Sequence, residues 1–319
     1  MNRKRTYFPE LSGESLESIE IERVSPDWAK NTCVTKYIIH FSGNTIKSIR
    51  GTASHNGLKQ VAWGIMQFLW RQGFNSGKTR IAQPLDFLPE QDALFYEEAP
   101  GIPLVSIMQT KSRDEISERL KDVAAWLVAL HELNPLGSTL PPARSVGVDE
   151  YRKVFGDLRE TGPEIGFDLD LAFLDTLGSP EVTLIHNDFY PGNIIIDATT
   201  VFGIDFEKSG MGSPYCDLAT MTSWFELPVQ DSTSIFAQGE LKGFRRVFLE
   251  SYCQLRHLDS DKTIRNLNKY LAKVFLDQAY EFAIIYLEGY KNSNEHVRDH
   301  YRRMVISLLD KFEKKLSLK

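Results

Sequence analysis

The segment from Leu184 to Gly210 constrains the fold of this 319-residue chain more than any other part of it. It reads LIHNDFYPGNIIIDATTVFGIDFEKSG, which is three short apolar runs separated by turn residues. We predict a strand, a loop and then a two-stranded hairpin. Side chains that can react or bind a metal interrupt the apolar runs at His186, Asp188, Asn193 and Asp205.

A hairpin of this kind can bring the loop before its first strand and the residues after its second strand to the same end. Asp188, Asn193 and Asp205 could then converge. Two carboxylates and an amide oxygen are hard ligands, which suit Mg²⁺ better than zinc. A carboxylate beside such a metal can orient a hydroxyl group and accept its proton. Together these are the requirements of phosphoryl transfer, in which the protein mainly positions groups and neutralises charge.

The spacing of these residues is more specific than their identity. The frame His-x-Asp-x-x-x-x-Asn is that of a kinase catalytic loop, and the later Asp-Phe fills the place of the metal-binding triplet. A His-x-Asp alone would be common by chance. The competing interpretation is that Asp188, Asn193 and Asp205 only build turns, which Asp and Asn favour. For His186 taken alone, a structural role in the core is the preferred interpretation.

The first hundred residues predict a small sheet with one helix. Residues 33–41 and 45–51 read as two strands joined by a tight turn, and residues 92–98 read as another strand. Residues 59–74 predict a helix. The i, i+4, i+7, i+8 spacing of that helix predicts a buried face made of Val61, Ile65, Phe68 and Leu69.

The chain becomes mainly helical after Gly101. Apolar residues at 4-3-4-3 spacing predict an amphipathic helix over residues 116–130, and the helical pattern returns from residue 238 to the end. Its last apolar stripe is predicted at Val297, Tyr301, Met304, Leu308 and Phe312. We therefore predict an α+β fold with a small β-rich N-lobe, residues 1–97, and a larger, mainly helical C-lobe, residues 98–319.

Composition excludes several classes of function. The net charge of −6 argues against bulk nucleic-acid binding. The three cysteines are far apart and lack CxxC spacing, which favours a reducing, cytoplasmic location. No signal peptide and no apolar run long enough to span a membrane is found, so no membrane association is expected. The sequence carries no signal for an oligomeric state.

On these motifs the chain resembles the aminoglycoside phosphotransferase-like and choline kinase-like small-molecule kinases, which share the protein kinase fold. HNDFYPGNIIID resembles the catalytic loop of that family, and GIDFEKSGMGSPYCDLA is similar to its metal-site segment. LFYEEAPGIPL resembles the hinge between its lobes, and WLVALHEL resembles a helix end of the family. The resemblance covers roughly residues 33–224.

The resemblance implies roles for particular residues. Asp188 would be the catalytic base, and Asn193 and Asp205 would bind Mg²⁺. Asp217 would brace the catalytic loop without binding the metal. The adenine of ATP would bind the backbone of the hinge at Glu97, Glu98 and Ala99.

The chain departs from the family where the phosphates should bind. The family carries a strand lysine on the phosphates, paired with a helix glutamate. Arg50 falls at the place of that lysine, with Lys47 on the opposite face of the strand. Residues 44–85 contain no Asp or Glu, so the usual ion pair cannot form within the following helix. Either Arg50 would be held by Gln60, by Gln67 or by an acid from elsewhere, or the nucleotide would be held differently.

Two further expectations concern charged side chains near these motifs. A solvent-facing position is preferred for Glu207. The basic residues of the acid-free window are expected on a solvated face; they are Lys47, Arg50, Lys59, Arg71, Lys78 and Arg80.

The resemblance implies an ATP- and Mg²⁺-dependent enzyme that moves the γ-phosphoryl group to a hydroxyl of a small molecule. An aminoglycoside, choline, a sugar, an amino acid like homoserine and a macrolide all stay open as acceptors. The first alternative is a pseudokinase that binds nucleotide or a partner without turnover, which the missing acid favours. The second is a protein kinase, against which the loop reads HND rather than HRD and no Ala-Pro-Glu follows Asp205.

Overall fold

The computed structural model describes residues 8, 11, 13–25, 33–133, 140–161, 169–178, 181–226, 238–291 and 295–317. The chain forms two compact units, and each is described by itself. Unit 1 comprises Met1–Ala129, Pro135–Pro141 and Pro191–Gly210. Unit 2 comprises Leu130–Asn134, Pro142–Tyr190 and Met211–Lys319. The α+β class predicted from the sequence is confirmed, while the lobe boundary after residue 97 stays a prediction.

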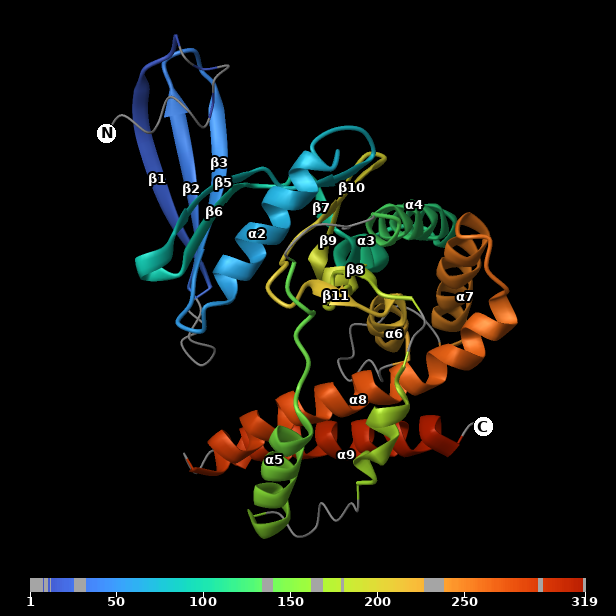
Figure 1. Ribbon diagram of the computed structural model, residues 1–319. Helices are drawn as coiled ribbons and strands as arrows, with labels where there is room; N and C mark the ends of the chain where they lie inside the picture. The colour runs from blue at the N-terminus through green and yellow to red at the C-terminus, as the bar shows by residue number, and fades with distance from the viewer. Residues whose placement is uncertain are drawn as a thin grey trace. The chain divides into compact units, whose positions relative to one another are not determined.

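Unit 1 begins with a five-stranded antiparallel sheet (Figure 1). The two strands and the turn predicted over residues 33–51 are confirmed, and so is the strand predicted at residues 92–98. In spatial order the strands are β1 (Leu16–Ser25), β2 (Cys33–Phe41), β3 (Ile46–Ala53), β6 (Ala93–Glu97) and β5 (Pro84–Leu88).

The edge strand β1 was not predicted, because its sequence LESIEIERVS reads as a solvated acidic segment. Its backbone pairs with β2 along nearly its whole length. Its apolar side chains are nevertheless exposed, with Ile19 at 42% and Ile21 at 68%. Ile19 and Ile21 alternate with Glu20 and Glu22, which is the period-two pattern of a strand, so the sequence contains a strand signal that its acidic composition concealed.

Helix α2 (Leu58–Arg71) contacts β5 and β6 of this sheet. The helix confirms the prediction for residues 59–74, but its predicted face was wrong in part. Val61 and Phe68 are only half-buried. The buried residues are Lys59, Ala62, Ile65, Met66 and Leu69, so the buried face lies further round the helix and includes a lysine.

A second sheet of unit 1 carries the predicted hairpin. Strands β9 (Ile194–Asp197) and β10 (Thr200–Gly203) pair antiparallel, with β4 (Thr79–Ile81) beside β10 and β7 (Ile102–Pro103) beside β9. Gly101, just before β7, has a φ of 107°, and a Cβ there would lie 2.2 Å from the Ile196 carbonyl oxygen. Only glycine allows the chain to pass this close to β9.

Two helices follow in unit 1, α3 (Leu104–Thr110) and α4 (Arg113–His131), and α4 confirms the helix predicted over residues 116–130. The indole Nε1 of Trp126 donates a hydrogen bond to the Arg80 carbonyl at 2.8 Å. A Cβ at Gly203 would lie 2.3 Å from the Trp126 ring. The buried indole therefore packs directly on β10 and fixes α4 against the hairpin sheet.

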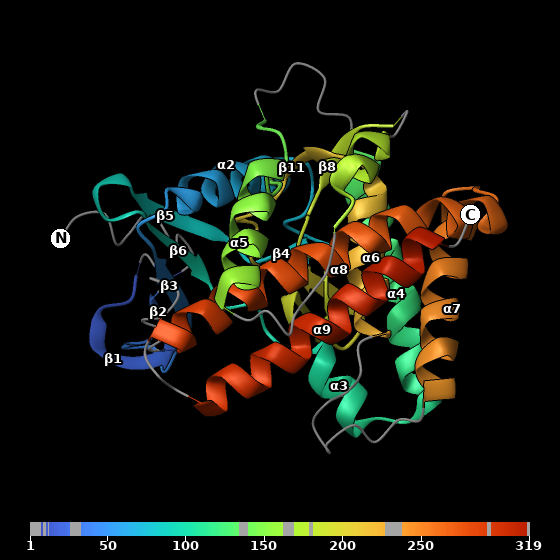
Figure 2. The same ribbon diagram turned by 90° about the horizontal axis from the view of Figure 1, so that it is seen from below.

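Unit 2 is mainly helical, as predicted for the C-terminal part of the chain. Its long helices α8 (Ser260–Lys291) and α9 (Glu295–Ser317) lie side by side in both views (Figures 1 and 2). Strand β8 (Thr183–Ile185) pairs with β11 (Gly210–Gly212). The remaining helices are α5 (Val148–Thr161), α6 (Pro214–Trp224) and α7 (Gln238–Leu255).

The apolar stripe predicted for the last helix is confirmed at Leu308 and Phe312, which are buried. Tyr301 and Met304 are half-buried, and the side chain of Val297 lies outside the described residues. No helix in the described ranges is both long and apolar enough to cross a membrane. The cysteines, all of which the structure describes, form no disulfide.

Candidate active site

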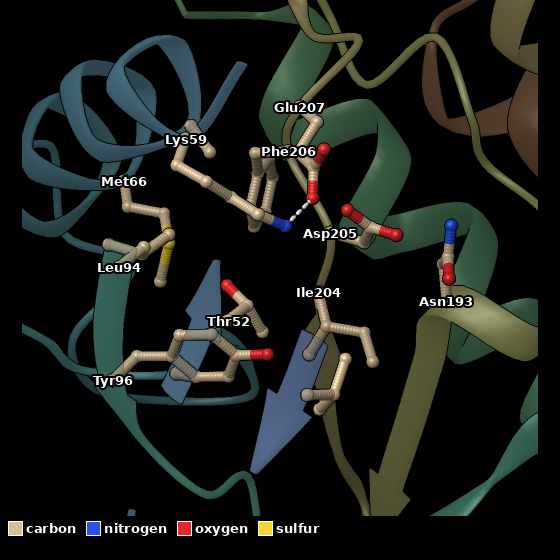
Figure 3. Close-up of a pocket in the computed structure, with 13 residues that line it drawn as sticks. Thr52, Lys59, Met66, Leu94, Tyr96, Asn193, Ile204, Asp205, Phe206 and Glu207 are labelled. Carbon is tan, nitrogen blue, oxygen red and sulfur yellow. Dashed lines mark hydrogen bonds and ion pairs between the residues drawn. The ribbon is translucent and has the colours of Figure 1, made fainter. Parts of the chain in front are cut away.

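Asn193 and Asp205 lie at the open end of the β9–β10 hairpin. Gly203 pairs with Ile194, and the next residue, Ile204, donates its amide hydrogen to the Asn193 carbonyl at 3.0 Å. The hairpin register therefore brings the residue before β9 next to the segment after β10. Asn193 is 5% exposed, whereas Asp205 is exposed. Both line one pocket (Figure 3), so the predicted convergence is confirmed for these two residues, while that of Asp188 with them stays a prediction.

The backbone at Asp205 has a φ of 67°, in the left-handed region. Residues other than glycine seldom adopt this conformation, and Asp and Asn tolerate it best. Strained backbone of this type is concentrated at functional sites, where the surrounding structure maintains it. Asp205 lies between the end of β10 and Glu207, whose carboxylate is paired with Lys59.

The pocket that contains Asn193 and Asp205 combines apolar and polar walls, all of them from unit 1. Val34, Ala62, Met66 and Leu94 supply apolar surface from β2, α2 and β6. A mixed lining of this kind suits a ligand with a flat apolar part and a charged part. The polar side chains among the described lining residues are Thr52, Lys59, Tyr96, Asn193, Asp205 and Glu207.

Tyr96 directs its hydroxyl group into this pocket (Figure 3). Desolvation by burial raises the pKa of the Tyr96 phenol well above its ordinary value, and the nearby carboxylate of Asp205 raises it further. The charge of Arg50 opposes this effect. At neutral pH Tyr96 is therefore a neutral phenol that can both donate and accept a hydrogen bond.

Lys59 is the most unexpected member of the pocket. Its residue is 2% exposed, and its ammonium group forms an ion pair with Glu207 (Figure 3). The expectations of a solvated face for Lys59 and of a solvent-facing Glu207 were therefore wrong. Lys59 falls on the buried stripe of α2 with Ala62 and Met66, at i, i+3 and i+7. Choosing that stripe, rather than the one through Val61, would have revealed the lysine from the sequence.

Arg50 does not line this pocket. Its Nε donates to Glu98 Oε1 at 2.8 Å, and Lys36 Nζ lies 2.9 Å from Glu98 Oε2. Burial alone would raise the pKa of Glu98, but hydrogen bonds from Lys36 and Arg50 hold it below its ordinary value. The acid that pairs with Arg50 therefore comes from outside the following helix, one of the possibilities left open by the sequence. A role of Arg50 in binding phosphate stays a prediction.

Lys47 pairs with Glu97 at 3.0 Å, whereas Arg50 pairs with Glu98. Their partners are neighbours on β6 and the residue after it, so the two cations lie on opposite faces of β3, as strand alternation predicted. The backbone amides of these partners are already used: Glu97 donates to the Gln83 carbonyl at 2.9 Å and Glu98 donates to the Ser48 carbonyl at 2.8 Å. Adenine binding at Glu97, Glu98 and Ala99 stays a prediction.

The first part of the catalytic-loop motif, His186 to Tyr190, belongs to unit 2, where Asp217 of α6 braces it. The Asp217 carboxylate is fully buried and accepts the amide hydrogens of His186, at 2.8 Å, and Asn187, at 2.6 Å. The same carboxylate lies 3.0 Å from Nε2 of His131, whose Nδ1 is 2.7 Å from the Tyr252 hydroxyl. The loop-bracing role expected of Asp217 is confirmed. The sequence did not reveal that His131 belongs to this network.

Asp188 follows directly after the braced backbone. Asn187 has a φ of 61°, and its side-chain Nδ2 donates to the Arg144 carbonyl at 2.6 Å. The amide of Tyr190 donates to the Asp188 carbonyl at 3.1 Å. The backbone on both sides of Asp188 is thus held by hydrogen bonds, which suits a side chain that must be positioned for catalysis. Its role as the base stays a prediction.

Asp217→Asn should test the brace. Asparagine keeps one acceptor oxygen, so at least one of the two buried amide hydrogens loses its partner. This should lower the free energy of unfolding by about 1–3 kcal/mol, as measured by urea denaturation. Turnover should fall as well, because the backbone before Asp188 is no longer fixed.

A matched control is Asp149→Asn. The Asp149 side chain is 95% exposed and pairs with Arg152 within α5. Its loss should change the free energy of unfolding by no more than about 0.5 kcal/mol. If the Asp217 and Asp149 variants had equal stability, the brace would contribute nothing to the fold.

Residues 61–257, more than half of the chain, match the model of the phosphotransferase enzyme family. No curated protein matches the sequence significantly.

Similar solved structures cover nearly the whole chain. A candidate aminoglycoside phosphotransferase from Ralstonia eutropha JMP134 has 13% identity and a TM-score of 0.62, with 98% of each chain covered. A choline/ethanolamine kinase family protein from Mesorhizobium loti has 14% identity and a TM-score of 0.56, covering 99% of this chain and 97% of that one. Macrolide 2′-phosphotransferase from Brachybacterium faecium has 12% identity and a TM-score of 0.52, covering 94% and 98%. At these identities the similarity concerns the fold, and it confirms the predicted protein kinase-like fold.

Proposed function

Because the chain belongs to the phosphotransferase enzyme family and is a small-molecule phosphotransferase, we propose that its phosphoryl donor is ATP and that transfer requires Mg²⁺. The observation that carries this proposal is the pocket of unit 1. There the β9–β10 hairpin places Asn193 and Asp205 on one wall, close to an apolar surface and a buried lysine. A nucleotide needs all three features, because its base is apolar and its phosphates are charged and bind metal.

The residues present fit Mg²⁺. The Asn193 amide oxygen and the Asp205 carboxylate would hold the ion, and both are hard oxygen donors on the same pocket. Within the described ranges, no group of three or more His, Cys, Asp or Glu side chains forms a separate metal cluster. Mg²⁺ is usually bound by only a few protein ligands, because it keeps several waters and shares its coordination shell with substrate phosphates. When bound, the ion would neutralise charge on the phosphates of the nucleotide.

Asp188 acts in the proposal as the base. The acceptor hydroxyl oxygen forms a bond to the γ-phosphorus, the bond from that phosphorus to the β,γ-bridging oxygen breaks, and ADP leaves. The hydroxyl proton passes to the Asp188 carboxylate. The frame His-x-Asp-x-x-x-x-Asn and the braced loop support this role.

The adenine ring of ATP would lie along the apolar wall of the pocket and the hinge at residues 97–99. Since the amides of Glu97 and Glu98 are used within the sheet, adenine would meet their carbonyls or the Ala99 backbone. Arg50 stays a candidate for the phosphates only if it exchanges Glu98 for them. A cytoplasmic location is also part of the proposal, because the three cysteines are far apart in the sequence and lack CxxC spacing.

A thermal-shift titration tests nucleotide and metal together. ATP should raise the unfolding midpoint in the presence of Mg²⁺ and much less in EDTA. ADP release should then appear with one member of a hydroxyl panel drawn from the acceptors of related enzymes. Stabilisation by Mg²⁺ and ATP without turnover on any acceptor would favour the pseudokinase alternative. No stabilisation at all would contradict the proposal.

A further inference from the structure

We infer that Lys59 binds the phosphate groups of the nucleotide, so that the cation of this site comes from helix α2 rather than from strand β3. The inference rests on the proposed function, since it concerns the same pocket. It also assigns a role to the buried Lys59–Glu207 ion pair, which was not predicted from the sequence.

The burial of the Lys59 ammonium group requires an explanation beyond folding. An ammonium group removed from water is costly unless it is paired, and even a paired ion seldom stabilises a fold more than apolar side chains of the same size would. Lys59 is 2% exposed on a helix face otherwise made of Ala62, Ile65, Met66 and Leu69. A methionine or leucine would satisfy packing on that face, so folding alone does not require a charge there.

The charge balance of the pocket favours Lys59 as the phosphate ligand. Two of the described lining residues, Asp205 and Glu207, are carboxylates that would repel the phosphates of a nucleotide. Among the same described residues, Lys59 is the one cation. It lies in the first turn of α2, where the positive end of the helix dipole also favours an anion. A phosphate group that enters the pocket would therefore be attracted electrostatically to the ammonium group of Lys59.

The position of the Lys59 ammonium group relative to Asp205, the proposed metal ligand, also supports the inference. Lys59 pairs with Glu207, which follows Asp205 by two residues. Figure 3 shows the Lys59 side chain pointing toward Glu207 at the side of the pocket where Asp205 lies. Phosphates that share a metal with Asp205 would come close to this ammonium group.

Strand β3 is the element from which the phosphate-binding cation was expected. Thr52 of β3 lines the pocket, so a hydroxyl group stands where the strand faces it. Arg50, on the same strand face two residues earlier, is bonded to Glu98. The absence of an acid from residues 44–85 then has a physical reason, because the ion pair is reversed. The lysine is on the helix, and the glutamate follows the metal-site aspartate.

The experiment compares Lys59→Met with the wild type by calorimetric titration of ATP and of adenosine, both in Mg²⁺. Losing a charge-assisted hydrogen bond should weaken ATP binding by about ten- to a hundredfold. Adenosine has no phosphate, so its affinity should not change. Equal loss for both ligands would mean that Lys59 only shapes the pocket, and the inference would be overturned.

The double variant Lys59→Met/Glu207→Gln separates binding from neutralisation. It removes the carboxylate that Lys59→Met leaves unpaired, so the fold should be at least as stable as that of the single variant. ATP affinity should stay low, because the pocket has the same net charge as before but no cation. Recovery of wild-type ATP affinity would overturn the inference, since Lys59 would then serve only to neutralise Glu207.

Lys47→Met is the matched control, because Lys47 also pairs with a glutamate in unit 1 but does not line the pocket. It should leave both affinities unchanged. If Arg50→Met lowered ATP affinity while Lys59→Met did not, Arg50 would be the phosphate ligand and the inference would be wrong, with the proposed function intact. A wild type that binds no nucleotide would instead overturn the proposed function, and the inference with it.

Discussion

Asp205→Ala is expected to lower the Mg²⁺-dependent rate of phosphoryl transfer by about 10²-fold or more, because a metal contributes several kcal/mol of charge stabilisation in such reactions. Asp205 is the exposed carboxylate at the open end of the hairpin, and Asn193 beside it is a buried amide. A carboxylate brings a full charge to the ion and an amide brings only a dipole. Asn193→Ala should therefore raise the Mg²⁺ requirement less than Asp205→Ala does.

Titration of Mg²⁺ at saturating ATP measures both effects. Asp197→Ala is the control, because Asp197 is an exposed aspartate of the same hairpin at the opposite end of β9. It should titrate like the wild type. If the Asp205 variant also gave a wild-type Mg²⁺ titration, Asp205 would not be a metal ligand.

Asp188→Asn should reduce kcat by about 10²- to 10⁴-fold, the range for loss of a positioned general base. The amide has nearly the same shape as the carboxylate, and hydrogen bonds from Asp217 and from the backbone hold the loop independently of this substitution. ATP affinity and the free energy of unfolding should consequently stay at wild-type values.

Single-turnover kinetics with bound ATP isolates the chemical step from product release. The unchanged ATP affinity is the internal control that the site is intact. Turnover of the Asp188 variant at the wild-type rate would show that another group accepts the proton, or that none is needed.

The convergence of Asn193 and Asp205 could be predicted because hairpin geometry is local. Once two short apolar runs are joined by a tight turn, the residues that flank them must lie at the same end. The opposite faces of Lys47 and Arg50 could be predicted for the same reason, since side chains alternate along a strand. In each case the relevant period is short and the residues are close in sequence.

The contacts that could not be predicted join residues distant in sequence. Glu98 pairs with Arg50 through the register of β3 and β6, and Glu207 reaches Lys59 of α2 from the segment that follows β10. The apolar positions of α2 also fit two overlapping stripes. The sequence favoured the stripe through Val61, but packing on β5 and β6 selected the one that contains Lys59. An amphipathic pattern can leave two neighbouring faces of a helix as candidates for the buried one. In α2 only one of these faces contains the charged residue Lys59.

Transfer of the γ-phosphate of ATP to a small-molecule hydroxyl group can be followed with a label on that phosphate. The wild-type protein is incubated with Mg²⁺, γ-labelled ATP and each acceptor of a panel that contains aminoglycosides, macrolides, choline, ethanolamine, sugars and homoserine, with a generic protein substrate alongside. We expect label on the hydroxyl group of one small-molecule class, loss of labelling in EDTA, and almost no label with Asp188→Asn. Label on the generic protein instead, or a wild type that binds Mg²⁺ and ATP tightly yet labels no acceptor, would contradict the proposed function.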